Sequence, residues 1–407
     1  MRRCFSAFLI GVIWELLYLT VILLLLTALG AFVATRARAA SLRKSGTAIF
    51  ASLPGQHGLL ASTLALIAGM LGALATLFAG SGKGWMMPTV ATAAGTIATL
   101  LILSQVSARL RARTIFETIV KFTLAASSAI AVLATVGIFA SVVFETAAFF
   151  KQVNVLDFLF GIHWTPTGTP PTFGFVPLFT GTMLITCIAL IVAAPLGLFA
   201  AIYLAEYASL SVRRVMKPVL ELLVGVPTVV LGFFAALTVA PLVRSTAASF
   251  GLDVASESAL AAGLVMGMMI VPLISSLSDD IINAVPQSLR DGSYAMGATK
   301  SETIKKVVLP AALPGIVSAL MLAVSRAIGE TMIVVMAAGL AANLSVNPLA
   351  AVTTITVQIA SLLVGDQEFD SAKTLSAFAL GFVLFFITLA LNYVALRIVQ
   401  RYRQAYE

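Results

Sequence analysis

The run from Phe179 to Leu204 reads FTGTMLITCIALIVAAPLGLFAAIYL and contains no charged residue. A helix of this length is about 39 Å long at a rise of about 1.5 Å per residue, which exceeds the ~30 Å hydrocarbon core of a bilayer. The run lacks the strict alternation of apolar and polar residues that is typical of a barrel strand. Since only helices and closed barrels satisfy their backbone hydrogen bonds inside lipid, the sequence predicts a transmembrane helix here.

Runs of the same character recur along the chain. Of its 407 residues, 60% are hydrophobic and 10% are charged, and the mean hydropathy is +1.05. Soluble domains carry about 25% charged residues. We therefore predict an all-α polytopic membrane protein, with spans at 6–33, 58–79, 85–104, 122–145, 179–204, 219–242, 258–277, 315–341 and 375–397. The first run is much longer than the ~7–15 residues of a signal-peptide core, so we expect it to be a retained helix.

The distribution of basic residues predicts the orientation. The formal net charge of +8 would indicate a nucleic-acid partner in a soluble protein. Here 18 of the 25 Lys and Arg residues fall in alternate loops and 6 in the others. The basic loops are 34–57, 105–121, 205–218, 278–314 and the tail from Arg397. Because cytoplasmic loops are enriched in Lys and Arg, we predict an outer N-terminus, a cytoplasmic C-terminus, a lipid bilayer as environment and no nucleic-acid partner.

Several kinds of site are not expected. Cys4 and Cys187 cannot form a disulfide framework, and neither has neighbouring metal ligands. His57 and His163 stand alone in polar segments, so we expect surface residues and no metal or cofactor. The chain has no Gly-x-x-x-x-Gly-Lys-Ser/Thr loop, and ATP hydrolysis is therefore expected in a separate subunit, not in this chain.

Two segments differ from the predicted spans in composition or length. Residues 165–174 are rich in Pro, Gly and Thr, which predicts an ordered external loop instead of a helix. Residues 349–364 are apolar but short, which favours an interfacial or re-entrant helix, although spanning stays possible. We expect a boundary near residue 121, dividing an N-terminal extension with three spans (1–121) from a core (122–407).

The loop 278–314 predicts a helix–turn–helix. Tyr294 belongs to a first short helical piece, and Gly297 allows the backbone to turn. Thr299 or Ser301 is expected to cap a second piece, which Leu309-Pro310 would end. Such an element fits a groove on a partner protein, whereas the alternative is a solvated connecting loop.

The spacing within this loop resembles the EAA motif of ATP-binding cassette (ABC) importer permeases. The matching positions are Asp291, Gly292, Ser293, Gly297, Val307, Leu309 and Pro310. Asp replaces the usual Glu, and Gly-Ser replaces Ala-Ala. The resemblance implies that 278–314 is a coupling loop that docks onto an ATP-binding cassette ATPase dimer.

A second constellation, Ser325-Arg326-Ala-Ile-Gly-Glu330-Thr331, lies inside a predicted span. A charge near the middle of a bilayer costs at least about 2.5–3.5 kcal/mol. Arg326 and Glu330 are four residues apart and are expected to meet on one helix face. They could form a self-neutralising structural pair. Alternatively, Arg326 could offer its guanidinium fork to an oxyanion in a pathway, held by Glu330.

The run Arg326–Met332 also resembles the signature of the PstC-type permease subunit of phosphate importers, as do residues 174–182, 221–228 and 286–310. The resemblance implies a MetI-like (type I) core of about six helices in a bacterial cytoplasmic membrane. It also implies a second homologous permease subunit and an extracytoplasmic phosphate-binding protein as partners. Glu221 and Thr228 could line the pathway. Permeation of sulfate or molybdate, a stand-alone secondary transporter or channel, and a membrane scaffold are the alternatives.

Overall fold

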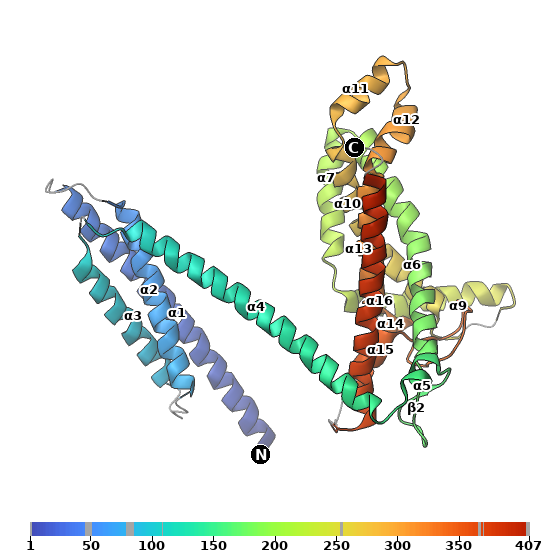
Figure 1. The fold of residues 1–407 in the computed structure, drawn as a ribbon, viewed down its shortest axis with the longest axis horizontal. Coiled ribbons are helices and arrows are strands. Elements are labelled where there is room, and N and C mark those ends of the chain that lie inside the picture. The colour runs from blue at the N-terminus through green and yellow to red at the C-terminus, as the bar shows by residue number, and fades with distance from the viewer. Residues whose placement is uncertain are drawn as a thin grey trace. The chain divides into compact units, whose positions relative to one another are not determined.

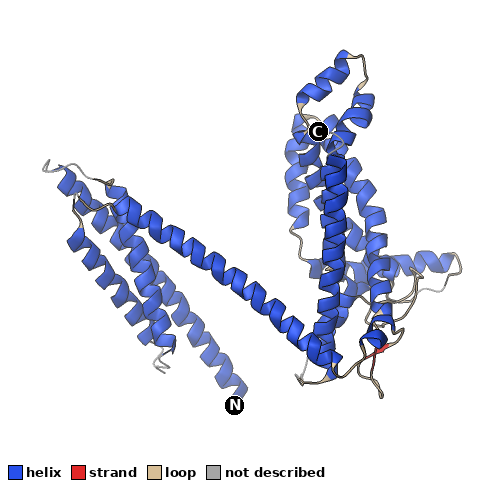
Figure 2. Ribbon diagram, viewed as in Figure 1, coloured by secondary structure: helices blue, strands red, loops and turns tan. Residues whose placement is uncertain are grey.

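The computed structural model describes residues 2–44, 51–78, 85–107, 109–252, 255–364, 368 and 370–403. Most of these residues are helical (Figure 2). Within the described residues, nine helical stretches are long and apolar enough to cross a membrane. They are Leu16–Lys44, Pro54–Phe78, Met86–Gln105, Ala112–Phe150, Val176–Tyr207, Thr228–Ser249, Ala259–Ala284, Lys300–Ile328 and Ala372–Arg397. The predicted all-α polytopic fold is confirmed.

The chain divides into two compact units, Met1–Val136 and Gly137–Glu407. In the first unit, helices α1 (Arg2–Lys44), α2 (Pro54–Phe78) and α3 (Met86–Gln105) pack on one another. Small side chains allow close approach: a Cβ added to Gly95 would lie 3.1 Å from the carbonyl oxygen of Ala65. Such small-residue contacts are usual between membrane helices. Helix α4 (Ala112–Phe150) begins in the first unit and ends in the second.

The second unit is built around α6 and α10, with α11 and α12 at one end and a small hairpin at the other (Figure 1). Its helices are α5 (Val155–Phe160), α6 (Val176–Ile202), α7 (Leu210–Val224), α8 (Thr228–Phe234), α9 (Ala240–Ser249), α10 (Ala259–Ala284), α11 (Gln287–Ala295), α12 (Lys300–Thr303), α13 (Leu309–Ile328), α14 (Met332–Ala337), α15 (Ile355–Leu362) and α16 (Ala372–Arg403). The π-helical turns are η1 (Tyr203–Tyr207), η2 (Ala235–Val239) and η3 (Ile304–Val308). Glycines bring α6 and α10 together, since a Cβ on Gly267 would lie 3.0 Å from the carbonyl oxygen of Ala189.

The segment 165–174 is ordered and non-helical, as predicted. Strands β1 (Trp164–Thr165) and β2 (Thr172–Phe173), near its two ends, pair antiparallel. The buried Phe149 of α4 meets Phe173 edge to face, with ring centroids 5.5 Å apart. Aromatic packing therefore holds the hairpin against the end of α4.

Residues 349–364, for which a membrane span stayed possible, contain the short helix α15 (Ile355–Leu362). It has eight residues, so it is only about 12 Å long and cannot cross a bilayer. Thr354 caps its N-terminus by accepting the N–H of Val357, and its Gln358 accepts the indole N–H of Trp164 at 3.0 Å. The segment thus packs inside the second unit as a short helix.

Two predicted spans, 219–242 and 315–341, are interrupted. Helix α7 ends at Val224 and α8 begins at Thr228, because the intervening Pro227 has no N–H and restricts the residue before it. Helix α13 ends at Ile328 and α14 begins only at Met332. The hydropathy of both runs is continuous, and it therefore conceals the breaks.

Two further expectations are wrong. Leu309-Pro310 does not end a helix, because the π-turn η3 leads directly into α13 and Pro310 occupies its first turn, where a missing N–H is tolerated. His57 is not a surface loop residue but is fully buried in α2. His163 is exposed, as expected.

Candidate functional site: the coupling loop and the helix break

The predicted helix–turn–helix is present as α11 and α12. Gly297 lies between them with φ +83°, a left-handed conformation that glycine adopts without strain. Thr299, not Ser301, caps α12: its hydroxyl accepts the N–H of Glu302 at 3.4 Å, and the Glu302 carboxylate accepts the N–H of Thr299 at 2.9 Å. This reciprocal capping box defines the start of α12. The two helices are joined by the Ser293 and Thr303 hydroxyls, 2.9 Å apart.

The outer surface of the loop combines apolar and charged side chains. Leu289, Tyr294 and Met296 are exposed, with Met296 at 88%. Asp291 lies on the same helix and accepts a hydrogen bond from Gln287, and Gly292 has no atom within 4 Å of an added Cβ. The remaining predicted loop residues, Val307, Leu309 and Pro310, lie half-buried at the base. An exposed apolar surface on a short, fixed helix pair is suited to a groove on a partner protein.

Arg326 and Glu330 do not form the expected pair. The helix ends between them, so the i, i+4 geometry is lost. Glu330 is 9% exposed, and its Oε1 accepts the N–H of Met332 at 3.2 Å. Arg326 is exposed and has no ion pair within 4.0 Å in the described part of the chain.

The break between α13 and α14 is built from polar groups of distant segments. The carbonyl of Glu330 accepts the hydroxyl proton of Thr356 at 2.9 Å, and the Thr354 hydroxyl lies 3.0 Å from that of Thr356. On the other side, Ser325 donates to the Asn392 side chain in α16 at 3.1 Å. Thr331 precedes α14 in the N-cap position. The bond from Thr356 satisfies a backbone carbonyl at the break, and the other two fix side chains around it.

Glu221 lies beside charged residues of α7. Glu221 lines a shallow hollow along α7 with Arg213 and Lys217, which are bound to the buried Asp279 at 3.1 and 3.2 Å. Lys217 also bonds Asp280, and this contact raises the pKa of the Lys217 ammonium. Both cations are therefore already neutralised.

Thr228 is the first residue of α8. Helix α8 packs on α14, since a Cβ on Gly232 would lie 3.1 Å from the carbonyl oxygen of Met332. The elements carrying Thr228 and the helix break are neighbours, but no hydrogen bond joins Thr228 to Arg326 within the described residues.

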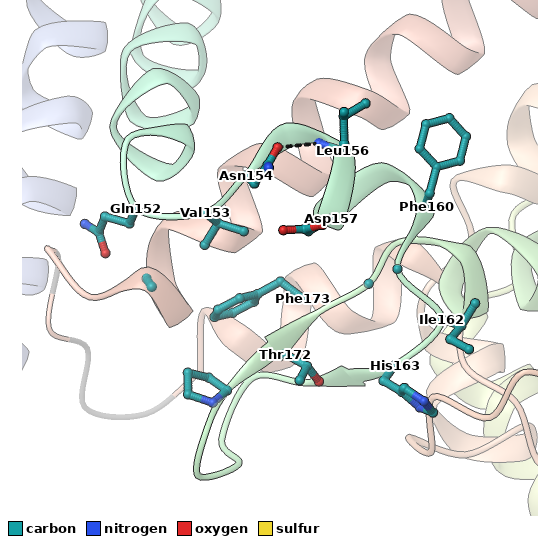
Figure 3. A pocket seen from close by; sticks show the side chains of 14 residues that line it. Gln152, Val153, Asn154, Leu156, Asp157, Phe160, Ile162, His163, Thr172 and Phe173 are labelled. Atoms are coloured by element: carbon teal, nitrogen blue, oxygen red, sulfur yellow. Dashed lines mark hydrogen bonds between the residues drawn. The ribbon is translucent and has the colours of Figure 1, made fainter.

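A hollow of about 730 Å³ lies at the hairpin end (Figure 3). Asn154 caps α5 at its edge by accepting the N–H of Leu156 at 3.0 Å, and Asp157 and His163 contribute the ionisable side chains. The described residues that line it include no Lys or Arg, so they offer no cation to a multiply charged anion.

The sequence pattern did not predict a pairing of Arg290 with Glu206, and Arg290 contributed only to the basic charge of its loop. The structure buries both and pairs them across 84 positions of the chain, with 3.0 Å between Arg290 Nη2 and Glu206 Oε1. The one local signal was an acid next to the end of a long apolar run, where the helix dipole disfavours it.

Residues 193–404 match the family described as "Binding-protein-dependent transport system inner membrane component". The chain is 34% identical over 249 residues to the "Probable ABC transporter permease protein YqgH" of Bacillus subtilis, covering 60% of this chain and 79% of that protein. It is 30% identical over 264 residues to the "Phosphate transport system permease protein PstC" of Mesorhizobium japonicum, covering 60% and 78%. With "Phosphate transport system permease protein PstC 1" of Mycobacterium tuberculosis the identity is 32% over 283 residues, covering 61% and 83%.

The fold is also similar to a solved structure, that of a bacterial ABC transporter involved in the import of the acidic polysaccharide alginate. The TM-score is 0.50 at 15% identity, and the match covers 71% of this chain and 99% of that one. The family match spans more than half of the chain and includes both the coupling loop and the helix break. This chain therefore belongs to the family of binding-protein-dependent transport system inner membrane components, as a multi-pass permease of an ABC importer.

Proposed function

We propose that this permease conducts inorganic phosphate across the bacterial cytoplasmic membrane. The observation that carries the proposal is Arg326, an exposed guanidinium beside a helix break, within a segment apolar enough to span the membrane. An unpaired charge within a membrane span is costly unless it serves a ligand or a water-filled pathway. Relatives named as phosphate permeases, at 30% and 32% identity, support the same substrate.

Arg326 is the proposed ligand, and its neighbours shape the break. A guanidinium donates two parallel hydrogen bonds to a tetrahedral oxyanion, which an ammonium cannot reproduce. Glu330 acts through the backbone, because its carboxylate accepts the Met332 N–H instead of neutralising Arg326. Ser325 and Thr331 flank the break, and Glu221 and Thr228 are proposed for the pathway leading to it.

The proposed complex contains this chain, a second homologous permease, an ATP-binding cassette ATPase dimer and an extracytoplasmic phosphate-binding protein. The coupling loop at Asp291, Gly292, Ser293, Gly297, Val307, Leu309 and Pro310 would contact the ATPase. That role requires the loop and the C-terminus to be cytoplasmic and the hairpin end to face outward. With nine spans, the N-terminus would then lie outside.

Labelled phosphate uptake tests the substrate. Cells with this gene are expected to accumulate phosphate in an ATP-dependent manner, and cells without it to lose that component. Excess unlabelled phosphate should compete, whereas sulfate and molybdate should not. Competition by sulfate or molybdate alone would transfer the assignment to another oxyanion, because Arg326 binds tetrahedral oxyanions as a class. Uptake that continues without any ATPase subunit would instead favour a stand-alone transporter.

A further inference from the structure

Arg290 is a buried cation at the start of the coupling loop. The residue is 8% exposed, and its Nη2 and Nε lie 3.0 and 3.4 Å from Oε1 of Glu206. The Glu206 side chain is itself 8% exposed. Charges this deeply buried are found almost only in pairs, because removal from water disfavours an isolated charge strongly.

The same guanidinium also binds the end of α10. Its Nη1 donates to the carbonyl of Val285 at 2.5 Å, and its Nη2 donates to that of Ile282 at 2.8 Å. These carbonyls lie at the C-terminal end of α10, where a cation is favoured by the helix dipole. One side chain therefore joins α11, the end of α10 and Glu206.

Glu206 lies in η1, directly after α6. A carboxylate at a helix C-terminus faces the negative end of the dipole and is unfavourable unless a cation is close. Arg290 supplies that cation. The adjacent Tyr207 receives a second contact from the loop, since the ammonium of Lys300 lies 5.1 Å from the centroid of its ring. Residues of both α11 and α12 thus hold the end of α6.

This contact matters because α6 is not covalently continuous with the loop. The loop continues directly into α10 at one end and α13 at the other. Helix α6 meets it through side chains: apolar packing around Ala201, Ile282 and Val308, and the Arg290–Glu206 pair. Apolar contacts are non-directional and permit sliding, whereas a charge-assisted pair with fixed donors sets a register. Helix α6 runs to the hairpin end of the same unit (Figure 1).

We propose that Arg290 and Glu206 are positioning residues that transmit movement of the coupling loop to α6. Displacement of α11 by the ATPase then moves α6 as well as α10 and α13, and so reaches the hairpin end. The inference rests on the proposed docking of the ATPase at this loop. Neither residue contacts substrate in this assignment.

The first test compares Glu206→Gln, Arg290→Gln and the double variant in the purified complex, reconstituted in liposomes. ATP hydrolysis is expected to persist, while phosphate transported per ATP falls about tenfold, within the usual range of coupling between sites. The double variant should transport no less phosphate per ATP than either single variant, because the two residues act as a unit. For Arg290→Lys, which keeps the charge but not the guanidinium fork, the phosphate transported per ATP should lie between the values of the unaltered complex and of Arg290→Gln. The matched control is Arg113→Gln, which breaks the exposed Arg113–Glu117 pair and should leave the ratio unchanged.

The second test follows α6 directly and needs no transported substrate. Cys187 is an exposed residue of α6 and can carry an environment-sensitive fluorophore in a Cys4→Ser background. A non-hydrolysable ATP analogue should change the fluorescence in the otherwise unaltered complex and leave it unchanged in Glu206→Gln.

The outcomes separate the inference from the proposed function. An assembled Glu206→Gln complex with an unaltered transport ratio and an unaltered Cys187 response would overturn the inference. So would a failure of both Glu206→Gln and Arg290→Lys to assemble, because the pair would then serve folding alone. If the unaltered complex moves no phosphate but its Cys187 response still requires the pair, the substrate assignment fails and the inference stands. If no ATPase associates with the chain, both fail.

Discussion

At the scale of single residues, Arg326 is the side chain on which the substrate assignment depends. It is exposed, and the helix ends before Glu330, which bonds Met332 instead. We expect Arg326→Lys to reduce phosphate uptake by at least about tenfold, since loss of a charge-assisted bidentate contact is worth roughly 1.4 kcal/mol or more. Initial rates of labelled phosphate uptake at matched protein levels are the measurement.

The control for this change is Arg244→Lys, at an exposed arginine of α9, which should leave uptake unaltered. The double change Arg326→Leu with Glu330→Leu tests whether transport needs these two charges at all. Near-normal uptake in both Arg326→Lys and the double-Leu variant would reduce Arg326 to a structural residue. The single change Arg326→Leu is less decisive, because it alters the charge balance of the span and can destabilise the helix bundle.

At the scale of elements, the turn between α11 and α12 depends on Gly297. No atom lies within 4 Å of a Cβ added there, so space is available, but φ is +83°. A left-handed conformation costs other residues about 1–2 kcal/mol. Gly297→Leu is therefore expected to reorient α11 against α12 and to uncouple ATP hydrolysis from transport while the protein stays in the membrane. The ratio of phosphate transported to ATP hydrolysed measures this effect.

Gly292→Ala is the matched control for that turn. Gly292 lies inside α11, has a negative φ and also has no atom within 4 Å of an added Cβ. Although Gly292 lies in the proposed contact surface, alanine is the residue that the EAA motif has at this position and is favoured in helices by about 1 kcal/mol over glycine, so this variant should couple normally. Normal ATP-driven uptake by Gly297→Leu would contradict the role assigned to Gly297.

At the scale of the whole molecule, one coupling loop per chain predicts a hetero-oligomer. An ATPase dimer offers two docking grooves, so a second homologous permease should occupy the other. The mass of the detergent-solubilised complex is expected to equal this chain, a second permease and two ATPase subunits, with the phosphate-binding protein added when it is bound. A particle that contains this chain without any ATPase would contradict the assignment.

The N-terminal unit lies outside the family match, which begins at residue 193. We propose that residues 1–121 are an extension and that 122–407 form the permease core. Helix α4 runs through residue 121 without a break, and the packing of the chain divides at Val136. The proposed boundary at residue 121 therefore does not coincide with the end of a helix.

The local geometry of the loop 278–314 could be predicted because its signals are local. The turn at Gly297 and the cap at Thr299 depend on residues within a few positions of each other, and both are confirmed. The Arg326–Glu330 pairing was wrong because spacing of four residues brings side chains together only in an unbroken helix. Gly329 ends α13, and the Glu330 side chain then satisfies the next helix start.

The sequence by itself determined that this protein crosses the membrane repeatedly and carries a helix–turn–helix between two of its spans, because hydropathy and turn chemistry act over short stretches of chain. Only the tertiary structure decided which charges are paired. Arg290 and Glu206 are 84 positions apart, and the Glu330 carbonyl meets Thr356 across 26. Such partners are selected by burial, since a polar group removed from water must find whichever donor or acceptor the packing of helices brings beside it.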